Sequence, residues 1–340
     1  MGRILSYTAI FSSLTLICTV QTAGFPSQSS KRGLVYVPNA NWPNDHKIWG
    51  RENSGLTWYY NYVGYPSRVY QNNTNLEFIP QLWGAPSGYA DTTFLKNVTA
   101  QIVEGSNITY ALGFNEPDGI GETGGSNVRP GDAARYWITQ MEPLRKLGVS
   151  LGAPAVTGAT QGFTWLSDFV KACGGNCTFD FVPVHWYGSF DGMASHIADV
   201  SEAYPGKPIW VTEFGLPNAP LKETQEFLNR SCAYFDANPN ITHYSYFGSF
   251  RSSVSNIGIN SAMLNSNGSL TDMGSWYLGG NGTGVLPDNI TYTATAGPPP
   301  SATYTLPPLA THPSAGHRPT LPSCLVAFLI IAWSWSKLIL

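Results

Sequence analysis

Charged residues are scarce in this sequence. They make up 11% of its 340 residues, with 18 Lys and Arg against 21 Asp and Glu, and the formal net charge is −3. A protein that binds nucleic acid needs a basic stripe to neutralise phosphates, and the sequence has none. Nucleic acid is therefore not an expected partner.

Cysteine is also scarce, and its placement argues against a metal site. Of the five cysteines, Cys18 and Cys324 lie in the terminal segments. Cys173 and Cys177 can close a small disulfide loop in an oxidising compartment, which leaves Cys232 as a buried thiol on an apolar helix stripe. A structural zinc ion would need a fourth ligand that this spacing does not offer. We expect no metal.

The first 24 residues have the pattern of a secretory signal peptide, in which Arg3 precedes an uncharged apolar run and small residues follow at 22–24. Residues 25–32 form a short pro-segment if the dibasic pair Lys31 and Arg32 is a processing site. The same pair can equally be two solvated linker charges. Secretion is supported by nine Asn-X-Ser/Thr sequons. They begin at Asn72, Asn97, Asn107, Asn176, Asn229, Asn240, Asn267, Asn281 and Asn289.

The C-terminal end divides into a polar spacer and an apolar tail. Residues 291–320 are rich in Pro, Ser and Thr, which predicts an extended spacer outside the folded domain. Residues 321–340 are apolar but short for a helix that must cross about 30 Å of hydrocarbon. Small residues at 314–316 and a polar stretch before the tail predict a GPI-anchor signal. Because Lys337 interrupts the tail, a tail anchor or a plain hydrophobic terminus remains the alternative.

The remaining segment, 33–290, alternates short apolar runs with longer amphipathic runs. This alternation is typical of β/α units with a parallel sheet. Its length is close to the roughly 250 residues of a single (β/α)8 barrel. We therefore predict one domain of the α/β class, a (β/α)8 TIM barrel.

Eight strands and five clear helices are predicted, and the connections before the second and third strands lack a helix pattern. The strands are Gly33–Val37, Thr57–Tyr62, Glu77–Leu82, Thr109–Asn115, Ser150–Ala153, Phe179–Trp186, Pro208–Glu213 and His243–Gly248. The helices are Thr92–Glu104, Pro130–Leu147, Phe163–Cys173, Met193–Tyr204 and Leu221–Ala237. Trp58 and Trp210 lie in the middle of strands and are predicted to pack in the core.

Two glutamates stand where apolar strands end, Glu116 after Asn115 and Glu213 in the run before Phe214. All strand carboxyl ends of a barrel open on one face, where active sites are built. The strand ends also supply amides and aromatic rings, which bind sugar hydroxyls and cover sugar ring faces. The predicted substrate-binding residues are Asn115, Asn61, Tyr62, Trp83, His185, Trp186, Tyr187 and Phe247.

A pair of carboxyl groups can hydrolyse a glycosidic bond if one holds a proton and the other is ionised. Asn115 is placed to hydrogen-bond a sugar hydroxyl, and His185 and Tyr187 are placed to orient the two carboxylates. His185 can instead be a satisfied core histidine, as strand histidines among aromatic residues often are.

Four motifs in this order resemble glycoside hydrolase family 128, the fungal glucanase-like proteins of the glycosyl hydrolase catalytic core type. The motifs are Trp58–Tyr62 (WYYNY), Leu112–Asp118 (LGFNEPD), Asp180–Tyr187 (DFVPVHWY) and Trp210–Gly215 (WVTEFG). More broadly, the barrel with Asn-Glu after strand four and Glu after strand seven is similar to a clan of retaining glycoside hydrolases.

This resemblance implies that Glu116 is the acid/base, that Glu213 is the nucleophile and that linear β-1,3-glucan is the ligand. It also implies a cell-wall or extracellular location and no metal or organic cofactor. Many members of the clan have Trp at the end of strand eight, whereas this chain has Tyr246-Phe247-Gly248. We expect a monomer that meets a membrane only through a lipid anchor. The alternatives are a glucan-binding wall protein without turnover and a hydrolase of another β-linked polysaccharide.

Overall fold

Eight parallel strands form the centre of the computed structural model, which describes residues 29–71, 73 and 75–288. All of these residues fall within one unit of the chain. Each strand overlaps the segment predicted for it, and most are shorter. The strands are β1 (Arg32–Val35), β2 (Trp58–Tyr60), β3 (Glu77–Phe78), β4 (Tyr110–Leu112), β5 (Ser150–Gly152), β6 (Val182–Tyr187), β7 (Ile209–Gly215) and β8 (Ile241–Tyr246).

The strands close into a barrel. Six of them form a sheet in the order β3-β2-β1-β8-β7-β6, and β4 and β5 form a second pair. Single parallel bridges, Gln81 to Leu112 and Gly152 to Phe181, connect this pair to β3 on one side and to β6 on the other. The order of neighbours therefore follows the order of the chain, and the predicted barrel fold is confirmed.

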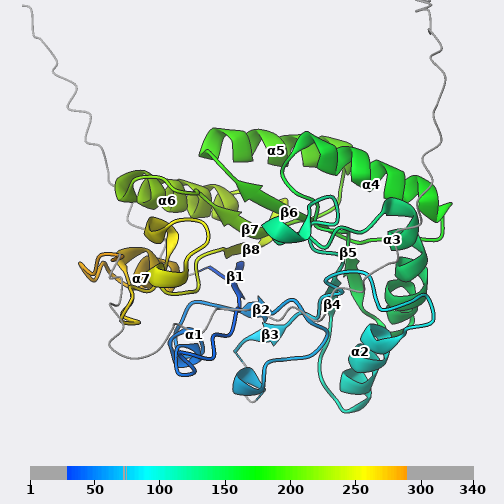
Figure 1. The fold of residues 1–340 in the computed structure, drawn as a ribbon, viewed down its shortest axis with the longest axis horizontal. Helices are drawn as coiled ribbons and strands as arrows, with labels where there is room; N and C mark the ends of the chain where they lie inside the picture. The colour runs from blue at the N-terminus through cyan, green and yellow to red at the C-terminus, as the bar shows by residue number, and fades with distance from the viewer. Residues whose placement is uncertain (1–28, 72, 74, 289–340) are drawn as a thin grey trace, which may run out of the picture. The chain divides into compact units, whose positions relative to one another are not determined.

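Helices surround the strands in chain order, as the ring of labels in Figure 1 shows. They are α1 (His46–Trp49), α2 (Thr93–Val103), α3 (Pro130–Tyr136), α4 (Thr160–Cys173), α5 (Phe190–Ala203), α6 (Leu221–Ala237) and α7 (Asp272–Tyr277). Before β2 and β3 the chain forms only the short helix α1 and the 3-10 turn Arg68–Tyr70, in agreement with the weak helix pattern there.

The predicted helix Pro130–Leu147 is not one α-helix. After α3 the backbone widens into a π turn over Trp137–Met141 and then tightens into 3-10 turns over Glu142–Leu147. Pro143 lies at this junction. Because proline has no N–H and its ring clashes with the carbonyl four residues earlier, regular α-helix cannot continue through it.

Aromatic rings fill the N-terminal half of the barrel interior. Trp210 stacks on Phe181 at 4.2 Å and on His243 at 3.6 Å between ring centroids, and Trp58 lies 5.3 Å from Trp210. Burial lowers the pKa of His243 to about 4, so this ring is neutral. Gly33 leaves the space for Trp58, since a Cβ atom there would lie 2.1 Å from the indole. The prediction that Trp58 and Trp210 pack in the core is confirmed, because each is 1% exposed.

The dibasic pair is part of the barrel rather than a linker. The Lys31 ammonium donates to the carbonyl oxygens of Phe235 (2.8 Å) and Asn238 (2.9 Å) at the end of α6, where a cation also complements the helix dipole. The buried Arg32 guanidinium donates to the Tyr244 hydroxyl at 2.8 Å. Cleavage after Arg32 would remove both anchors. The predicted domain start at Gly33 is therefore too late by at least these two residues.

The predicted terminal segments lie largely outside the described residues. This applies to the signal peptide (1–24), the spacer (291–320) and the apolar tail (321–340). The last described residue, Asp288, accepts a hydrogen bond from the backbone of Ser266 at 2.7 Å, so the domain extends to this point. Among the described residues, no helix is long and apolar enough to span a bilayer.

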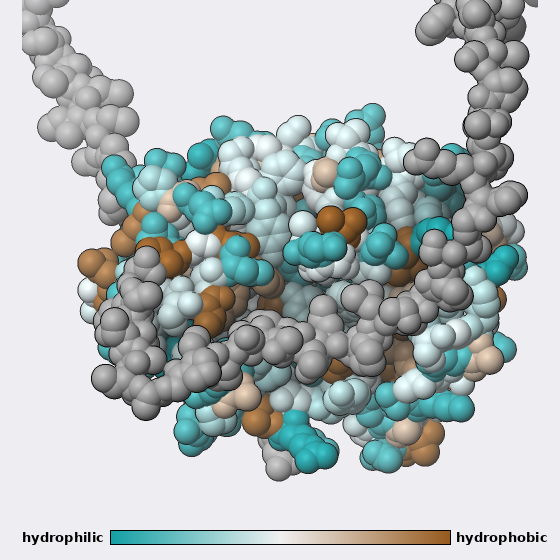
Figure 2. All heavy atoms as spheres, viewed as in Figure 1, coloured by the Kyte–Doolittle hydropathy of each residue, from teal (hydrophilic) through white to brown (hydrophobic). Residues whose placement is uncertain are grey.

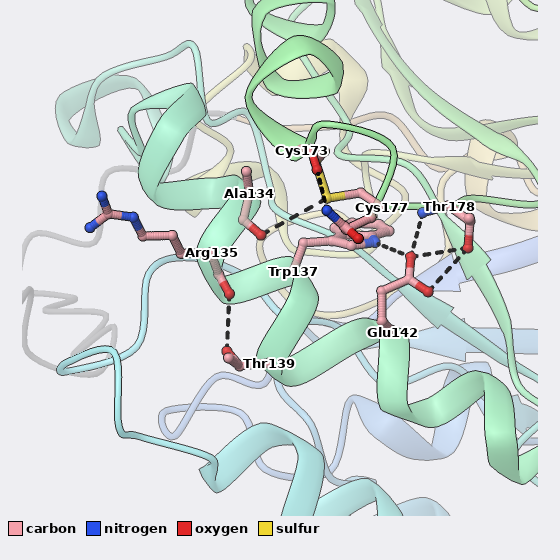
Figure 3. Close-up of a disulfide and its surroundings, with 9 residues drawn as sticks. Ala134, Arg135, Trp137, Thr139, Glu142, Cys173, Cys177 and Thr178 are labelled. Carbon is pink, nitrogen blue, oxygen red and sulfur yellow. Dashed lines mark hydrogen bonds between the residues drawn. A yellow bond between two sulfur atoms is a disulfide. The ribbon is translucent and has the colours of Figure 1, made fainter.

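Cys173 and Cys177 form a disulfide at the end of α4, while the thiol of Cys232 is free and buried. The loop closed by the disulfide packs beside α3, with Cys177 near the Ala134 carbonyl (Figure 3). Next to it, Glu142 accepts hydrogen bonds from the Trp137 indole at 3.1 Å and from Thr178. On the face seen in Figure 2, hydrophobic residues lie in small scattered groups among polar ones.

Candidate active site

Glu116 is held at the end of β4 by a strained but well-bonded backbone. Its φ is +40°, a left-handed conformation that is uncommon for a residue with a side chain. Its N–H donates to the Ala155 carbonyl at 2.7 Å, and its own carbonyl accepts from Gly119 at 2.9 Å and from Ser126 at 3.2 Å. Strain that the surrounding structure enforces in this way is typical of functional sites.

Glu213 points into the barrel because of a β-bulge. Val184 pairs with Val211, but the next residue of β6, His185, pairs with Glu213, so Thr212 is extra. With strict alternation Glu213 would lie on the opposite face from Trp210, which packs inside the barrel. The extra residue returns Glu213 to the interior, and bulges often re-aim a side chain beside an active site.

Three tyrosine hydroxyls converge on the Glu213 carboxylate. Tyr62 donates to Oε1 at 2.7 Å, Tyr187 donates to Oε2 at 2.6 Å, and Tyr60 lies 3.3 Å from Oε1. Burial raises the pKa of all three tyrosines well above the ordinary value, so each hydroxyl keeps its proton and acts as a donor. A carboxyl group that accepts hydrogen bonds on both oxygens is stabilised in its ionised form.

His185 lies between the two glutamates. Its Nδ1 is 3.0 Å from Glu116 Oε1 and 3.5 Å from Glu213 Oε2, and the side chain is 1% exposed. Burial lowers the pKa of His185, but the charges of Glu213 and Glu116 outweigh this effect and raise it above the ordinary value. Burial and the neighbouring Glu116 raise the pKa of Glu213, while His185 and the hydroxyls of Tyr187 and Tyr62 oppose this rise. His185 and Glu213 therefore each retain a proton more readily than the same side chain would in isolation.

Glu116, Glu213 and His185 lie close enough together to bound the distance between the two carboxylates. One oxygen each from Glu116 and Glu213 and one His185 nitrogen all lie within 4.8 Å of one another. A divalent cation could bridge such a trio, although both oxygens of Glu213 already accept tyrosine hydroxyls. The second ring nitrogen of His185, Nε2, is buried and has no partner among the described residues.

Asn115 is fastened to the loop that follows Glu116. Its side-chain amide donates to the Gly124 carbonyl at 3.1 Å, and its Oδ1 has no partner in the described part of the chain. The loop 119–129 folds back on itself, with Gly125 donating to the Ile120 carbonyl at 3.0 Å. A Cβ atom on Gly125 would lie 2.4 Å from the Gly119 backbone, so only glycine permits this close approach. The loop is therefore a tight support for the end of β4.

The other predicted residues at strand ends differ in their relation to the glutamates. Trp83 is half-buried, and its carbonyl accepts from the Asn115 N–H at 2.8 Å, which places it beside the site. Asn61 donates to the Tyr65 carbonyl at 3.2 Å and makes no hydrogen bond to either glutamate. The Phe247 ring packs edge-on against Tyr187 at 5.7 Å and so borders the site.

Trp186 does not fit the role predicted for it. Its ring lies 5.3 Å from that of His196 on α5, and its indole N–H donates to the Ser189 carbonyl at 3.0 Å. His185 and Tyr187 on either side of it contact the glutamates, so Trp186 lies on the opposite face of β6. The side chain packs against the helix layer and is removed from the expected substrate contacts.

Tyr60 contacts Glu213 but was not among the residues predicted for the site. Its hydroxyl also donates to the Thr212 carbonyl at 3.0 Å, which supports the bulge. A signal for it was present in the sequence, since Tyr60 is two residues before Tyr62 in the predicted strand Thr57–Tyr62, where alternation places both side chains on one face.

The chain is similar to solved structures of glycoside hydrolase family 128. One is a subgroup III curdlan-specific exo-β-1,3-glucanase from Blastomyces gilchristii in complex with glucose, with 28% identity and a TM-score of 0.58 over 74% of this chain and 98% of that one. Another is a subgroup VII oligosaccharide-binding protein from Cryptococcus neoformans, with 26% identity and a TM-score of 0.57 over 76% and 97%. The resemblance noted from the motifs is confirmed.

A curated relative is alkali-sensitive linkage protein 1 of Schizosaccharomyces pombe (strain 972 / ATCC 24843). It is 29% identical over 262 residues, which cover 74% of this chain and 45% of the relative, so the chain spans less than half of that protein's length. A family model described as glycosyl hydrolase catalytic core matches residues 33–277. Since this match covers most of the chain, the protein belongs to the glycosyl hydrolase catalytic core family.

Proposed function

We propose that this protein is a glycoside hydrolase that acts on β-1,3-glucan by a retaining mechanism. The observation that carries the proposal is the pair Glu116 and Glu213, buried, joined by His185 and close to each other at the C-terminal end of the barrel. Solved relatives named as β-1,3-glucanases have the same fold and cover the same part of the chain. Sugar-binding relatives show that the same scaffold also serves for binding alone.

Glu213 is proposed as the nucleophile. Its oxygen attacks the anomeric carbon, the glycosidic bond breaks, and the departing oxygen takes a proton from Glu116. Glu116 then removes a proton from water, which attacks the anomeric carbon and releases Glu213. The separation within 4.8 Å supports direct attack, because retaining enzymes have carboxyl groups about 5–5.5 Å apart and inverting enzymes about 6.5–9.5 Å.

The environments of the two glutamates support this division of roles. Burial raises the pKa of Glu213, but the hydroxyls that its two oxygens accept oppose this rise and so favour the ionised form that a nucleophile needs. Glu116 has one contact of this kind, with His185, a residue that retains a proton readily. Asn115, Trp83 and Phe247 are proposed to contact the sugar, because amides bind hydroxyls and aromatic rings cover pyranose faces.

The second candidate function is glucan binding without turnover. It is favoured by the oligosaccharide-binding protein from Cryptococcus neoformans, which is almost as similar to this chain as the glucanase from Blastomyces gilchristii. The paired glutamates favour the enzyme, since a binding module has no need of two buried carboxylates that share a histidine.

We also propose that the protein is secreted, attached to the cell surface by a GPI anchor, located at the cell wall and monomeric. The N-terminal signal pattern, the sequons and the disulfide support passage through an oxidising compartment. The C-terminal small residues and apolar tail support the anchor.

The test is release of reducing sugar from linear β-1,3-glucan by the secreted protein, with xylan, mannan and cellulose as controls for other β-linked polymers. Glu213→Gln should abolish release and keep glucan binding, while Glu223→Gln on the exposed side of α6 should behave as wild type. Release by wild type and Glu223→Gln alone would establish the hydrolase. Binding by all three proteins without release would establish the binding module instead.

A further inference from the structure

Asp118 ties the loop after β4 to the loop after β5, which is the neighbouring strand of the barrel (Figure 1). One oxygen of its carboxylate accepts from the Thr157 backbone N–H at 2.9 Å, and the other accepts from the Thr157 hydroxyl at 2.5 Å. Both residues are partly buried. Hydrogen bonds to a carboxylate are stronger than those between neutral groups. The two loops are therefore joined by a pair of strong bonds to a single residue.

The place of this tie follows from the backbone around Glu116. The parallel pairing of the two segments extends to Asn115 and Ala155. There the Ala155 N–H donates to the Phe114 carbonyl at 2.9 Å, and the Glu116 N–H donates to the Ala155 carbonyl at 2.7 Å. The next bond of a regular parallel ladder would run from the Thr157 N–H to the Glu116 carbonyl.

The left-handed turn at Glu116 replaces this bond. Because the φ of Glu116 is +40°, its carbonyl accepts instead from the N–H groups of Gly119 and Ser126. The Asp118 carboxylate then accepts the Thr157 N–H in place of the Glu116 carbonyl. The tie thus occupies the donor that would otherwise draw the Glu116 backbone back into the ladder.

The carboxyl of Glu116 depends on its backbone for its position more than that of Glu213 does. Glu213 accepts tyrosine hydroxyls on both oxygens. In the described part of the chain the Glu116 carboxyl has one hydrogen bond, to His185 at 3.0 Å. A strained backbone persists only where its surroundings enforce it. Without the tie, Glu116 can relax toward the extended conformation of a strand, and its carboxyl then leaves its place beside Glu213.

The charge of Asp118 also reaches the site. Burial lowers the pKa of His185, whereas the charges of Glu213 and Glu116, and to a smaller extent that of Asp118, raise it. Asp118 can therefore act through its hydrogen bonds or through its charge. An asparagine separates the two, because its carbonyl accepts from an N–H and its amide donates to a hydroxyl oxygen without carrying a charge.

We propose that Asp118 is a positioning residue, which holds the turn that aims the Glu116 carboxyl by bonding the Thr157 N–H and hydroxyl. It acts through these hydrogen bonds. The inference rests on the proposed function, since it concerns the proton that Glu116 gives to the departing oxygen. A sugar leaving group needs this proton, whereas an activated aryl leaving group departs without it. Loss of the tie should therefore affect the first kind of substrate and spare the second.

The test compares kcat/KM on a β-1,3-gluco-oligosaccharide with kcat/KM on its activated aryl glycoside, because this parameter reports the steps up to the first cleavage of the glycosidic bond. Asp118→Ala should lower kcat/KM on the oligosaccharide by roughly 10–100-fold, as a small misplacement of a catalytic group does, and change it little on the aryl glycoside. Asp118→Asn should keep both hydrogen bonds and restore most of the activity on the oligosaccharide.

Asp91→Ala is the matched control. Asp91 lies in the loop after β3, at the same end of the barrel, and also accepts from a backbone N–H and a hydroxyl, both of Ser87, at 3.2 Å and 2.7 Å. Its other carboxylate oxygen accepts from the Thr93 N–H, so these bonds stay within residues 87–93. This variant should have the same ratio of the two kcat/KM values as wild type.

Two results would overturn the inference alone. One is an Asp118→Ala variant that loses nothing or loses equally on both substrates. The other is an Asp118→Asn variant that loses as much as Asp118→Ala, which would assign the effect to charge. If Asp118→Ala does not fold, Thr157→Val, which removes only the hydroxyl bond, must show the same preference to a smaller degree, and its absence would overturn the inference. A wild-type protein that cleaves neither substrate would overturn the proposed function and this inference with it.

Discussion

Replacing Tyr187 with phenylalanine removes one of the two short hydrogen bonds to Glu213 and little else. The hydroxyl lies 2.6 Å from Oε2 and the ring keeps its edge-on contact with Phe247. A hydrogen bond to a charged group contributes about 1.5–3 kcal/mol. Because 1.36 kcal/mol corresponds to one pKa unit, the pKa of Glu213, which burial already raises, should rise further by roughly 1–2 units.

The assay is the pH dependence of kcat/KM on a soluble β-1,3-gluco-oligosaccharide, whose acid limb reports the ionisation of the free enzyme's nucleophile. In Tyr187→Phe this limb should move to higher pH by roughly 1–2 units. Tyr60→Phe is the matched control, because its hydroxyl is 3.3 Å from Oε1 and is shared with the Thr212 carbonyl. Its shift should be less than half as large. An unmoved acid limb in Tyr187→Phe, or equal shifts in both variants, would refute the assignment of Glu213 as the ionised group.

Three other predictions follow from the same geometry. Glu116→Ala with azide and an activated aryl glycoside should yield a β-glycosyl azide; an α-azide would show that the roles of Glu116 and Glu213 are reversed. Because the pKa of Glu213 is raised in the folded protein, its contribution to stability is greatest below the unfolded pKa of about 4.3 and declines as pH rises through the folded pKa. Glu213→Gln should therefore unfold at a higher temperature than wild type at pH 7 and lose this advantage near pH 4. A difference in unfolding temperature that stays constant between these pH values would contradict the prediction. Trp210→Ala should lower the free energy of unfolding, measured by chemical denaturation, by roughly 3–5 kcal/mol, because Trp210 is buried. Trp42 is half-exposed, so Trp42→Ala should lower it much less. Equal losses in the two variants would mean that the barrel interior is not packed as described.

Much of the fold was predictable because the signals for it are local. The alternation of apolar and polar residues indicates which side chains face a core, and this pattern predicted all eight strands. The helix boundaries were predicted less accurately where a single residue ends an α-helix. Pro143 has no backbone N–H to donate, so it interrupts a helix that the apolar pattern alone would continue. The sequence left the role of the dibasic pair Lys31 and Arg32 open for the opposite reason, since the partners of these side chains lie more than 200 residues away on α6 and β8.

The site was partly predictable. Strand position marked Glu116 and Glu213, and the alternation of side chains could also have marked Tyr60 beside Tyr62. The same alternation argued against Trp186 once His185 and Tyr187 were placed in the site. Sequence alone could not reveal the bulge at Thr212, because a bulge is a property of the pairing between two strands and not of either strand by itself.

The sequence by itself determined the barrel, the end at which the glutamates would stand and the disulfide pair, because hydrophobic period and chain order specify these features directly. Only the tertiary structure decided that Tyr62 and Tyr187 meet on one carboxylate and that His185 joins both glutamates. These relations depend on register and on side-chain direction across strands that are 151 and 26 residues apart from Glu213 along the chain. Local patterns contain no information about such distances, which packing alone sets.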